Sequence, residues 1–146
     1  MPNPAPPDQS LISVALESEP EGSVLVIVFI PSKTAEGKDL PRRQSQVLWA
    51  EAARKELSEM FDGATEMPPA MGSWMNPETE ELVSEKVVLV HSYTNPSKVQ
   101  DAKNLRKLAT FLHRMGRVLL QGEIVVVIDG VMHRIRKFAK EASWAS

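Results

Sequence analysis

The sequence has no cysteine among its 146 residues. Disulfide bonds, thiolate metal sites and cysteine nucleophiles are therefore excluded, and this composition fits a reducing compartment such as the cytoplasm. Long hydrophobic runs are also absent, because the longest, Val24–Pro31, is far shorter than the roughly 18 residues that span a bilayer. We therefore expect a soluble, cytoplasmic protein that has no membrane partner.

An excess of charge of one sign is missing as well. Lysine and arginine number 17 and aspartate and glutamate 19, which gives a formal net charge of −2. Such a balance creates no global positive field, so nucleic acid is not an expected partner. The sequence also lacks a glycine-rich phosphate loop and a serine-nucleophile motif. Nothing therefore points to one reaction, so we leave open whether the protein is an enzyme and expect no cofactor.

The length predicts one domain with tails. Residues 1–22 are rich in Pro, Ser and Glu, a composition typical of a mobile arm. Residues 11–16 are the exception, because this apolar run could add an edge strand or dock on the domain. We predict a single α+β domain over residues 23–136 and a C-terminal tail over residues 137–146.

The first half of the domain changes from a strand period to a helix period. The continuous β-branched run Val24–Ile30 predicts a strand that is apolar on both faces. From Pro41 onward, apolar residues recur at helical spacing. We expect a helix with Asp39 as its cap, Pro41 in its first turn and Gly63 just past its end.

The second half repeats this change of period. Residues 85–94 predict a strand with alternating faces. Asn95 and Pro96 are expected to begin a helix that ends near Gly116. The dipeptide Asp129–Gly130, between two apolar runs, predicts a hairpin.

The resulting order of elements predicts an α+β fold, a ferredoxin-like βαββαβ sandwich with an extra C-terminal hairpin strand. In that topology the first and third strands are central, and the two strongest apolar runs are assigned to them. The segment 63–82 carries Pro68, Pro69 and Pro77, which cannot donate to a ladder. This segment is therefore expected to form only a short edge strand or a loop.

Three stretches resemble known proteins: GATEMPPAMGSWMN, EKVVLVHSYT and LHRMGRVLLQGEIVVVIDG. They are similar to a family of small bacterial proteins with a helix ending in Gly-Ala-Thr, a Gly-x-Trp strand, a Val-rich strand and a terminal Gln-x-Glu strand. The resemblance covers about residues 24–135 and leaves both tails unmatched. Because that family has no established activity, the resemblance supports the fold and implies no catalytic residue.

Four side chains form a candidate pocket: Trp74, His91, Tyr93 and Glu123. His91 could act as a general base, because imidazole titrates near neutrality, and Trp74 could stack on a flat ligand. Each residue also has a plainer structural interpretation. His91 and Tyr93 could be a half-buried pair whose polar groups are hydrogen-bonded, and Glu123 could be a solvated carboxylate. Trp74 could be a core or interface residue. The strand of Glu123 is expected on the far side of the first strand, roughly 10 Å from His91, so no tight His–Glu dyad is expected.

Metal and phosphate sites receive little support. His91, His113 and His133 fall on separate expected elements without i, i+4 pairing, so no metal site is expected. The basic cluster His133–Lys140 could contact phosphate, but a solvated tail is the plainer interpretation.

Two functions of different classes remain. The first is an interaction module that self-associates through its sheet, because helices on one side of a sheet leave the other side to be covered. The second is a small-molecule-binding protein or enzyme with a pocket near Trp74, His91 and Tyr93. Because residues 24–30 are apolar on both faces, we favour the first, and we expect a homodimer or larger homo-oligomer, with another protein as a further candidate partner.

Overall fold

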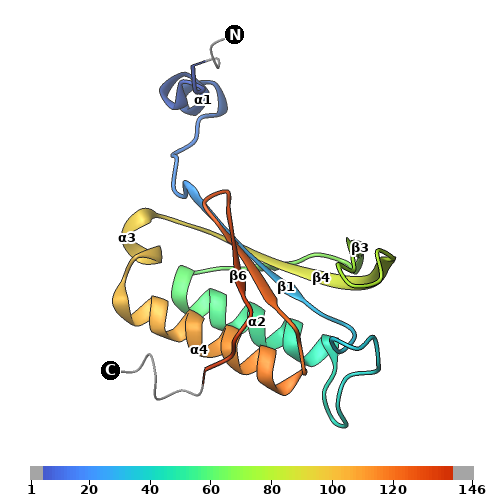
Figure 1. The fold of residues 1–146 in the computed structure, drawn as a ribbon. Helices are drawn as coiled ribbons and strands as arrows, with labels where there is room; N and C mark the ends of the chain where they lie inside the picture. The colour runs from blue at the N-terminus through green and yellow to red at the C-terminus, as the bar shows by residue number, and fades with distance from the viewer. Residues whose placement is uncertain (1–4, 140–146) are drawn as a thin grey trace.

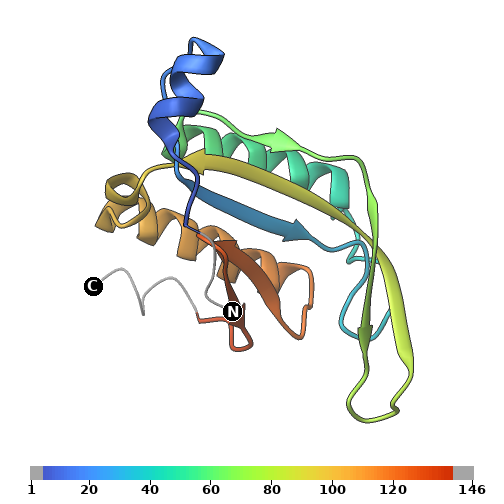
Figure 2. The ribbon, with the colours of Figure 1, turned by 90° about the horizontal axis from the view of Figure 1, so that it is seen from above.

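The computed structural model describes residues 5–139 as a six-stranded sheet with two long helices packed on one face (Figure 1). The strand order is β2-β4-β1-β5-β6, and β3 pairs with a further part of β4. Seen from above, the strands lie in front of both long helices (Figure 2). In chain order the elements are α1 (Gln9–Leu16), β1 (Val24–Ile30), α2 (Gln46–Phe61), β2 (Thr65–Glu66), β3 (Ala70–Met75), β4 (Leu82–Thr94), α3 (Pro96–Val99), α4 (Ala102–Val118), β5 (Ile124–Ile128) and β6 (Val131–Ile135).

The predicted α+β class and the extra C-terminal hairpin strand are confirmed. Strand β1 lies between β4 and β5, and β4 lies between β1 and the short strands β2 and β3, so the two strongest apolar runs are central. Asp129 and Gly130 join β5 to β6, with φ values of 52° and 78°. Two left-handed residues in a two-residue turn match the right-handed twist of the flanking strands, which explains this hairpin.

The core lies between the sheet and the helices. Alternate residues of β1, from Val24 to Ile30, are at most 4% exposed, because successive side chains of a strand point to opposite faces. The helices meet them with buried apolar residues at helical spacing: Ala50, Ala53 and Leu57 on α2, and Leu108, Leu112 and Met115 on α4. Burial of this apolar surface is the main stabilising term of the domain.

The expected start of the first long helix is wrong, whereas Gly63 lies just past its C-terminal end, as expected. Ser45 is the N-cap of α2 and its side chain accepts a hydrogen bond from the Leu48 backbone N–H at 3.1 Å. Pro41 lies in a preceding turn, and Asp39 forms an ion pair with Lys33 at 2.7 Å. At the C-terminal end Asp62, not Gly63, takes the left-handed conformation, with φ 73°.

The second helical segment is divided, because Asn95 caps the short α3 and Asp101 caps the separate helix α4. Gly116 does not end this helix, since α4 continues to Val118. A side chain at position 116 would collide with the ring of Phe138, which packs against the core. Gly116 is therefore required for a close approach and not for a turn.

The proline-interrupted segment forms short strands, as expected. β2 has only two residues, and β3 pairs with the end of β4 that extends beyond the helix layer. Pro68 and Pro69 lie between β2 and β3, and Pro77 lies in the turn between β3 and β4. A residue without an N–H thus never occupies a ladder position.

The N-terminal arm carries one helix, α1, and none of its residues is buried. The alternative in which residues 11–16 form an edge strand is therefore wrong. Mobility of residues 1–22 stays a prediction, and residues 1–4 lie outside the described range. Of the expected C-terminal tail, residues 140–146 also lie outside it. No helix within residues 5–139 is long and apolar enough to cross a membrane.

Candidate functional site: the open face of the sheet

One face of the sheet points away from α2 and α4, and we call it the open face. Its apolar and aromatic members alternate along the strands with the buried core residues: Leu25, Ile27, Phe29, Val87, Leu89, His91, Tyr93, Val125, Val127 and Met132. Thr65 of β2 and Arg134 of β6 lie on the same face, opposite His91 and Val125. Thr65, His91, Ile27, Val127 and Met132 lie opposite one another across β2, β4, β1, β5 and β6. At about 4.8 Å between neighbouring strands, this row is about 19 Å long.

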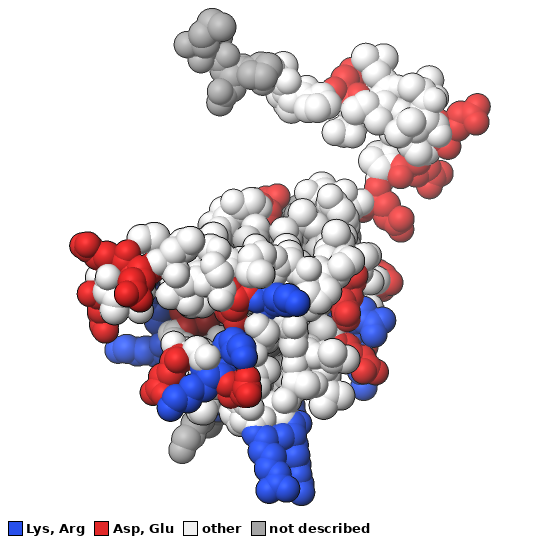
Figure 3. All heavy atoms as spheres, turned by 90° about the vertical axis from the view of Figure 1, so that its right-hand side faces the viewer, with Lys and Arg blue, Asp and Glu red and all other residues white. Residues whose placement is uncertain are grey.

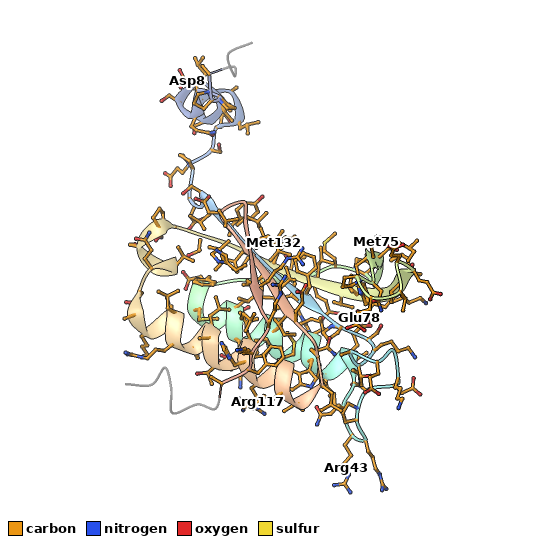
Figure 4. The ribbon with its side chains drawn as sticks, viewed as in Figure 1. Asp8, Arg43, Met75, Glu78, Arg117 and Met132 are labelled. Carbon is orange, nitrogen blue, oxygen red and sulfur yellow. The ribbon has the colours of Figure 1, made fainter. Side chains whose placement is uncertain are left out.

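The open face is largely apolar and only partly exposed. Tyr93 is 60% exposed and Met132 is 54% exposed, whereas the other apolar members are half-buried by their neighbours. Met132 extends above the sheet, and Arg117 lies on the helix layer below it (Figure 4). The space-filling view shows mostly uncharged atoms along the upper part of the domain, with charged groups lower down and at one end (Figure 3). No helix among residues 5–139 packs against this face.

Sequence reasoning placed Val87, Leu89, His91 and Tyr93 on one face of their strand. It did not assign the β1 members to that face, because it grouped them with Val88 and Val90, which the structure places on the core face. It also missed the members from the C-terminal hairpin. Val125, Val127 and Met132 join the face because β5 and β6 extend the sheet beyond β1. The alternation of the hairpin strands and the two-residue turn at 129–130 together fix their register. These signals could have assigned all three residues to the open face.

His91 and Tyr93 are adjacent on the open face, as their spacing of two residues predicts. Their ring centroids are 6.4 Å apart, and the rings meet edge to face at 83°. His91 pairs across the ladder with Ile27 on one side and Thr65 on the other. The two rings therefore form a small aromatic group in an otherwise aliphatic surface.

Trp74 lies far from this aromatic group. It pairs with Val83, whereas His91 is eight residues further along β4. At about 3.4 Å per residue this separation is about 27 Å, so Trp74 cannot border the same pocket. Trp74 is also 47% exposed, which excludes the interpretation as a core residue within the described chain.

Glu123 is likewise not part of the group. Its carboxylate forms ion pairs with Arg134 at 3.2 Å and Arg136 at 3.4 Å. It directly precedes β5, which β1 separates from β4, in agreement with the expected separation from His91. Of the four predicted pocket residues, only His91 and Tyr93 are together, and a ligand-binding role for them stays a prediction.

Two hollows in the described surface lie on the helix layer. The larger, about 620 Å³, is lined mainly by α2. The smaller, about 230 Å³, lies between α2 and α4 beside the Trp49–Phe111 ring pair, whose centroids are 5.7 Å apart. Trp49 is explained structurally, because its indole N–H donates to Gln44 Oε1 at 2.7 Å and Arg114 lies over its ring.

The chain that follows β6 packs on the helix layer. The backbone N–H of Ala139 donates to His113 Nδ1 at 3.0 Å, and Arg117 Nη1 donates to the Ala139 carbonyl at 2.7 Å. Burial lowers the pKa of His113, and the positive charge of Arg117 lowers that pKa further. His113 thus acts as a neutral acceptor. Among residues 5–139 no group of His, Asp and Glu is arranged to hold a metal ion.

No protein-family model and no curated protein matches this chain, so the family resemblance seen in the sequence gains no support. The fold, however, has solved counterparts. A phage SAM lyase in complex with S-methyl-5'-thioadenosine is similar, with a TM-score of 0.55 at 11% identity over 81% of this chain and 92% of that chain.

A phage SAM lyase in the apo state gives a TM-score of 0.52 at 12% identity, over 82% of this chain and 93% of that chain. A Bacillus cereus protein related to NIF3 gives 0.47 at 15% identity, and the match spans 80% of this chain but only 27% of that protein. At these identities the likeness concerns the fold alone.

Proposed function

We propose that this chain is a self-associating interaction module that uses the open face as its binding surface. The observation that carries this proposal is the row of side chains across five strands, from Thr65 to Met132, which no helix of residues 5–139 covers. Antiparallel sheets that face water on one side usually alternate apolar and polar residues. Here Leu25, Ile27 and Phe29 replace the expected polar residues, and contiguous apolar surface of this kind marks interaction sites.

A second copy is the partner that the surface fits best. An interface with twofold symmetry brings the same patch of both subunits together, so a suitable patch must not repel itself. The open face comes close to this condition, because its members are aliphatic or aromatic apart from Thr65, His91 and Arg134, and Arg134 is paired with Glu123. Two such faces can meet without burying an unpaired carboxylate or ammonium group.

The test is sedimentation equilibrium of the full chain and of matched charge variants. We expect a dimer at protein concentrations on the order of 10 µM and a monomer for Tyr93→Lys/Met132→Lys, which introduces two charges into the open face. The control is Val47→Lys/Leu105→Lys, which replaces exposed aliphatic residues of α2 and α4. A wild-type monomer at these concentrations, or equal loss of association in the control, would overturn the proposal.

A second candidate function is the binding of an adenosine-containing small molecule at His91 and Tyr93. The likeness in fold to the phage SAM lyase solved with S-methyl-5'-thioadenosine favours this class of ligand. The exposed ring of Tyr93 supports it, because an aromatic face can stack on any nucleobase. His91 beside it offers a polar group for orientation.

This second function is tested by titrating S-methyl-5'-thioadenosine and SAM into the labelled protein and following the His91 and Tyr93 NMR signals. We expect the signals of both residues to shift, and Tyr93→Ala to lose the response while the matched variant Trp74→Ala keeps it. SAM consumption measured in the same samples tests for turnover. No shift at millimolar ligand would exclude this site.

A further inference from the structure

We propose that helix α1 of one copy docks on the open face of a second copy, so that two chains exchange their N-terminal arms. This inference rests on the proposed function, because it names the element that covers the surface through which the copies associate. It connects two apolar surfaces that are both uncovered within residues 5–139.

Helix α1 has an apolar surface that no residue in the range 5–139 covers. At about 100° per residue, its three polar residues fall on one side and its aliphatic residues occupy the rest of the circumference. The large aliphatic residues are exposed: Leu11 by 69%, Ile12 by 39%, Val14 by 78% and Leu16 by 68%. A helix of eight residues is marginal in water, and most helices gain their stability by packing such a face. A partner surface for α1 is therefore needed.

The linker directs α1 away from its own sheet. Glu17 ends the helix with φ 51°, and Ser23 rejoins the sheet through a 3.0 Å hydrogen bond from its N–H to the Thr94 carbonyl. Pro20, in the short segment between them, has a fixed φ and holds Glu19 in an extended conformation. The arm rises from the domain on the side of the open face and stands clear of it (Figure 1). A second copy whose open face is turned toward the first would receive this helix.

The dimensions of the two surfaces are compatible. α1 is about 12 Å long at 1.5 Å per residue, which fits within the row of about 19 Å across five strands. A twofold arrangement uses both surfaces completely, because each copy donates one α1 and receives one. Exchange of a terminal element through a short linker is a common route to dimers of this symmetry.

The charges of the two surfaces are opposite in sign. Residues 1–32 contain no lysine or arginine, whereas Asp8, Glu17, Glu19 and Glu21 are acidic, and the space-filling view shows this acidic arm (Figure 3). The β6 edge of the open face leads into a basic run, 134–137, whose two arginines share the single carboxylate of Glu123. The run therefore keeps an excess of positive charge. Opposite charges of this kind orient two partners and accelerate their encounter.

The decisive experiment is cross-linking between two versions of the full chain that differ in mass through a tag. Because the natural chain has no cysteine, Leu11→Cys in one version and Tyr93→Cys in the other are the only thiols present. With a short bis-maleimide, we expect a product that joins the two versions. The matched control is Ser13→Cys, on the polar side of α1, which should give much less of that product. Equal yields from positions 11 and 13, or no product, would overturn arm exchange.

A variant that carries both Leu11→Cys and Tyr93→Cys in one chain tests whether the arm instead folds back on its own sheet. Arm exchange predicts cross-linked dimers at concentrations where the protein is dimeric. A monomer linked within one chain, without intermolecular product at those concentrations, would overturn the proposal. The two products differ in mass, so their relative amounts can be measured separately.

Association measurements separate this inference from the proposed function. We expect Leu11→Ser/Val14→Ser/Leu16→Ser to weaken the dimer by at least about tenfold in Kd, and Gln9→Ala/Ser13→Ala to leave it unchanged. Because α1 has no buried residue, these changes should leave the fold intact by circular dichroism. A monomeric wild type would reject both ideas. If open-face variants disrupt the dimer and α1 variants do not, the proposed function stands and arm exchange is wrong.

Discussion

The two faces of β1 carry the same class of side chain in different surroundings. Val24, Val26, Val28 and Ile30 are at most 4% exposed beneath the helices, whereas the residues between them are half-buried on the open face. A contiguous apolar strand face that no element of the same chain covers is typical of an interaction site. The difference between the faces is therefore the observation on which the proposed association depends.

The two ends of the chain differ in the same way. After β6, Phe138 packs over Gly116 and Ala139 bonds to His113 and Arg117, so this end completes the helix layer. The N-terminal arm carries large aliphatic residues and buries none of them. One end thus serves its own domain, and the other has the composition of an element that serves a neighbour.

The largest expected effect is a contrast between Ile30→Ala and Ile27→Ala on the same strand. Ile30 is fully buried, so its truncation should cost about 3 kcal/mol of unfolding free energy through lost burial and the remaining cavity. Ile27 is half-buried on the open face, so in the monomeric Tyr93→Lys/Met132→Lys background its truncation should cost about 1 kcal/mol. Urea unfolding measures both values.

The same two variants, Ile30→Ala and Ile27→Ala, also test the difference between the two faces under conditions in which the chain associates. In the wild-type background, the cost of Ile27→Ala should rise with protein concentration, because the proposed dimer would bury this residue. The cost of Ile30→Ala should not depend on concentration. Equal costs at both positions in the monomer would mean that the open face is already covered within one chain.

A smaller effect is expected for Trp74→Ala. With 47% of Trp74 exposed on β3, truncation should cost less than about 1 kcal/mol in the monomer, below the roughly 3 kcal/mol of a core residue. The matched control is Trp49→Ala, since Trp49 is 7% exposed and packs against Phe111. A loss near 3 kcal/mol at both tryptophans, measured in urea, would contradict the placement of Trp74 on an exposed strand.

The sequence was sufficient for the features that depend on local period. The alternation of β1 and β4, the turn at 129–130 and the helical stripes follow from side-chain geometry, so class and strand order could be predicted. The start of α2 could not be predicted in this way, because Asp39 and Ser45 are both acceptable N-cap residues. In the structure Ser45 caps the helix, and Asp39 pairs instead with Lys33.

The candidate site was less predictable because it depends on register and on long-range packing. His91 and Tyr93 are neighbours by their spacing alone. The separation of Trp74 follows from the short antiparallel connection between β3 and β4, which pairs Trp74 with the N-terminal end of the 13-residue strand β4. The sequence interpretation missed this because it began the strand at residue 85 and did not recognise the hairpin. Gly116 was taken for a helix stop, since its contact with Phe138, 22 residues away, has no trace in local pattern.

The smallest expected effect tests the C-terminal end, where His113 accepts a hydrogen bond from Ala139. Burial lowers the pKa of His113, so below about pH 6.5 the unfolded chain takes up a proton that the folded state resists. The contribution of His113 to stability is therefore complete at higher pH and is lost as the pH falls from about 6.5 through its folded pKa. Thermal unfolding between pH 8 and pH 5.5 measures this loss of stability. His113→Asn keeps an oxygen acceptor but does not titrate, so we expect this variant to flatten the dependence of stability on pH.

His133→Asn, on exposed β6, controls for the loss of a histidine and should keep the wild-type pH dependence because His113 remains. If His113→Asn follows the wild-type curve, another group is responsible for the pH dependence, and the titration of His113 does not affect stability in this range.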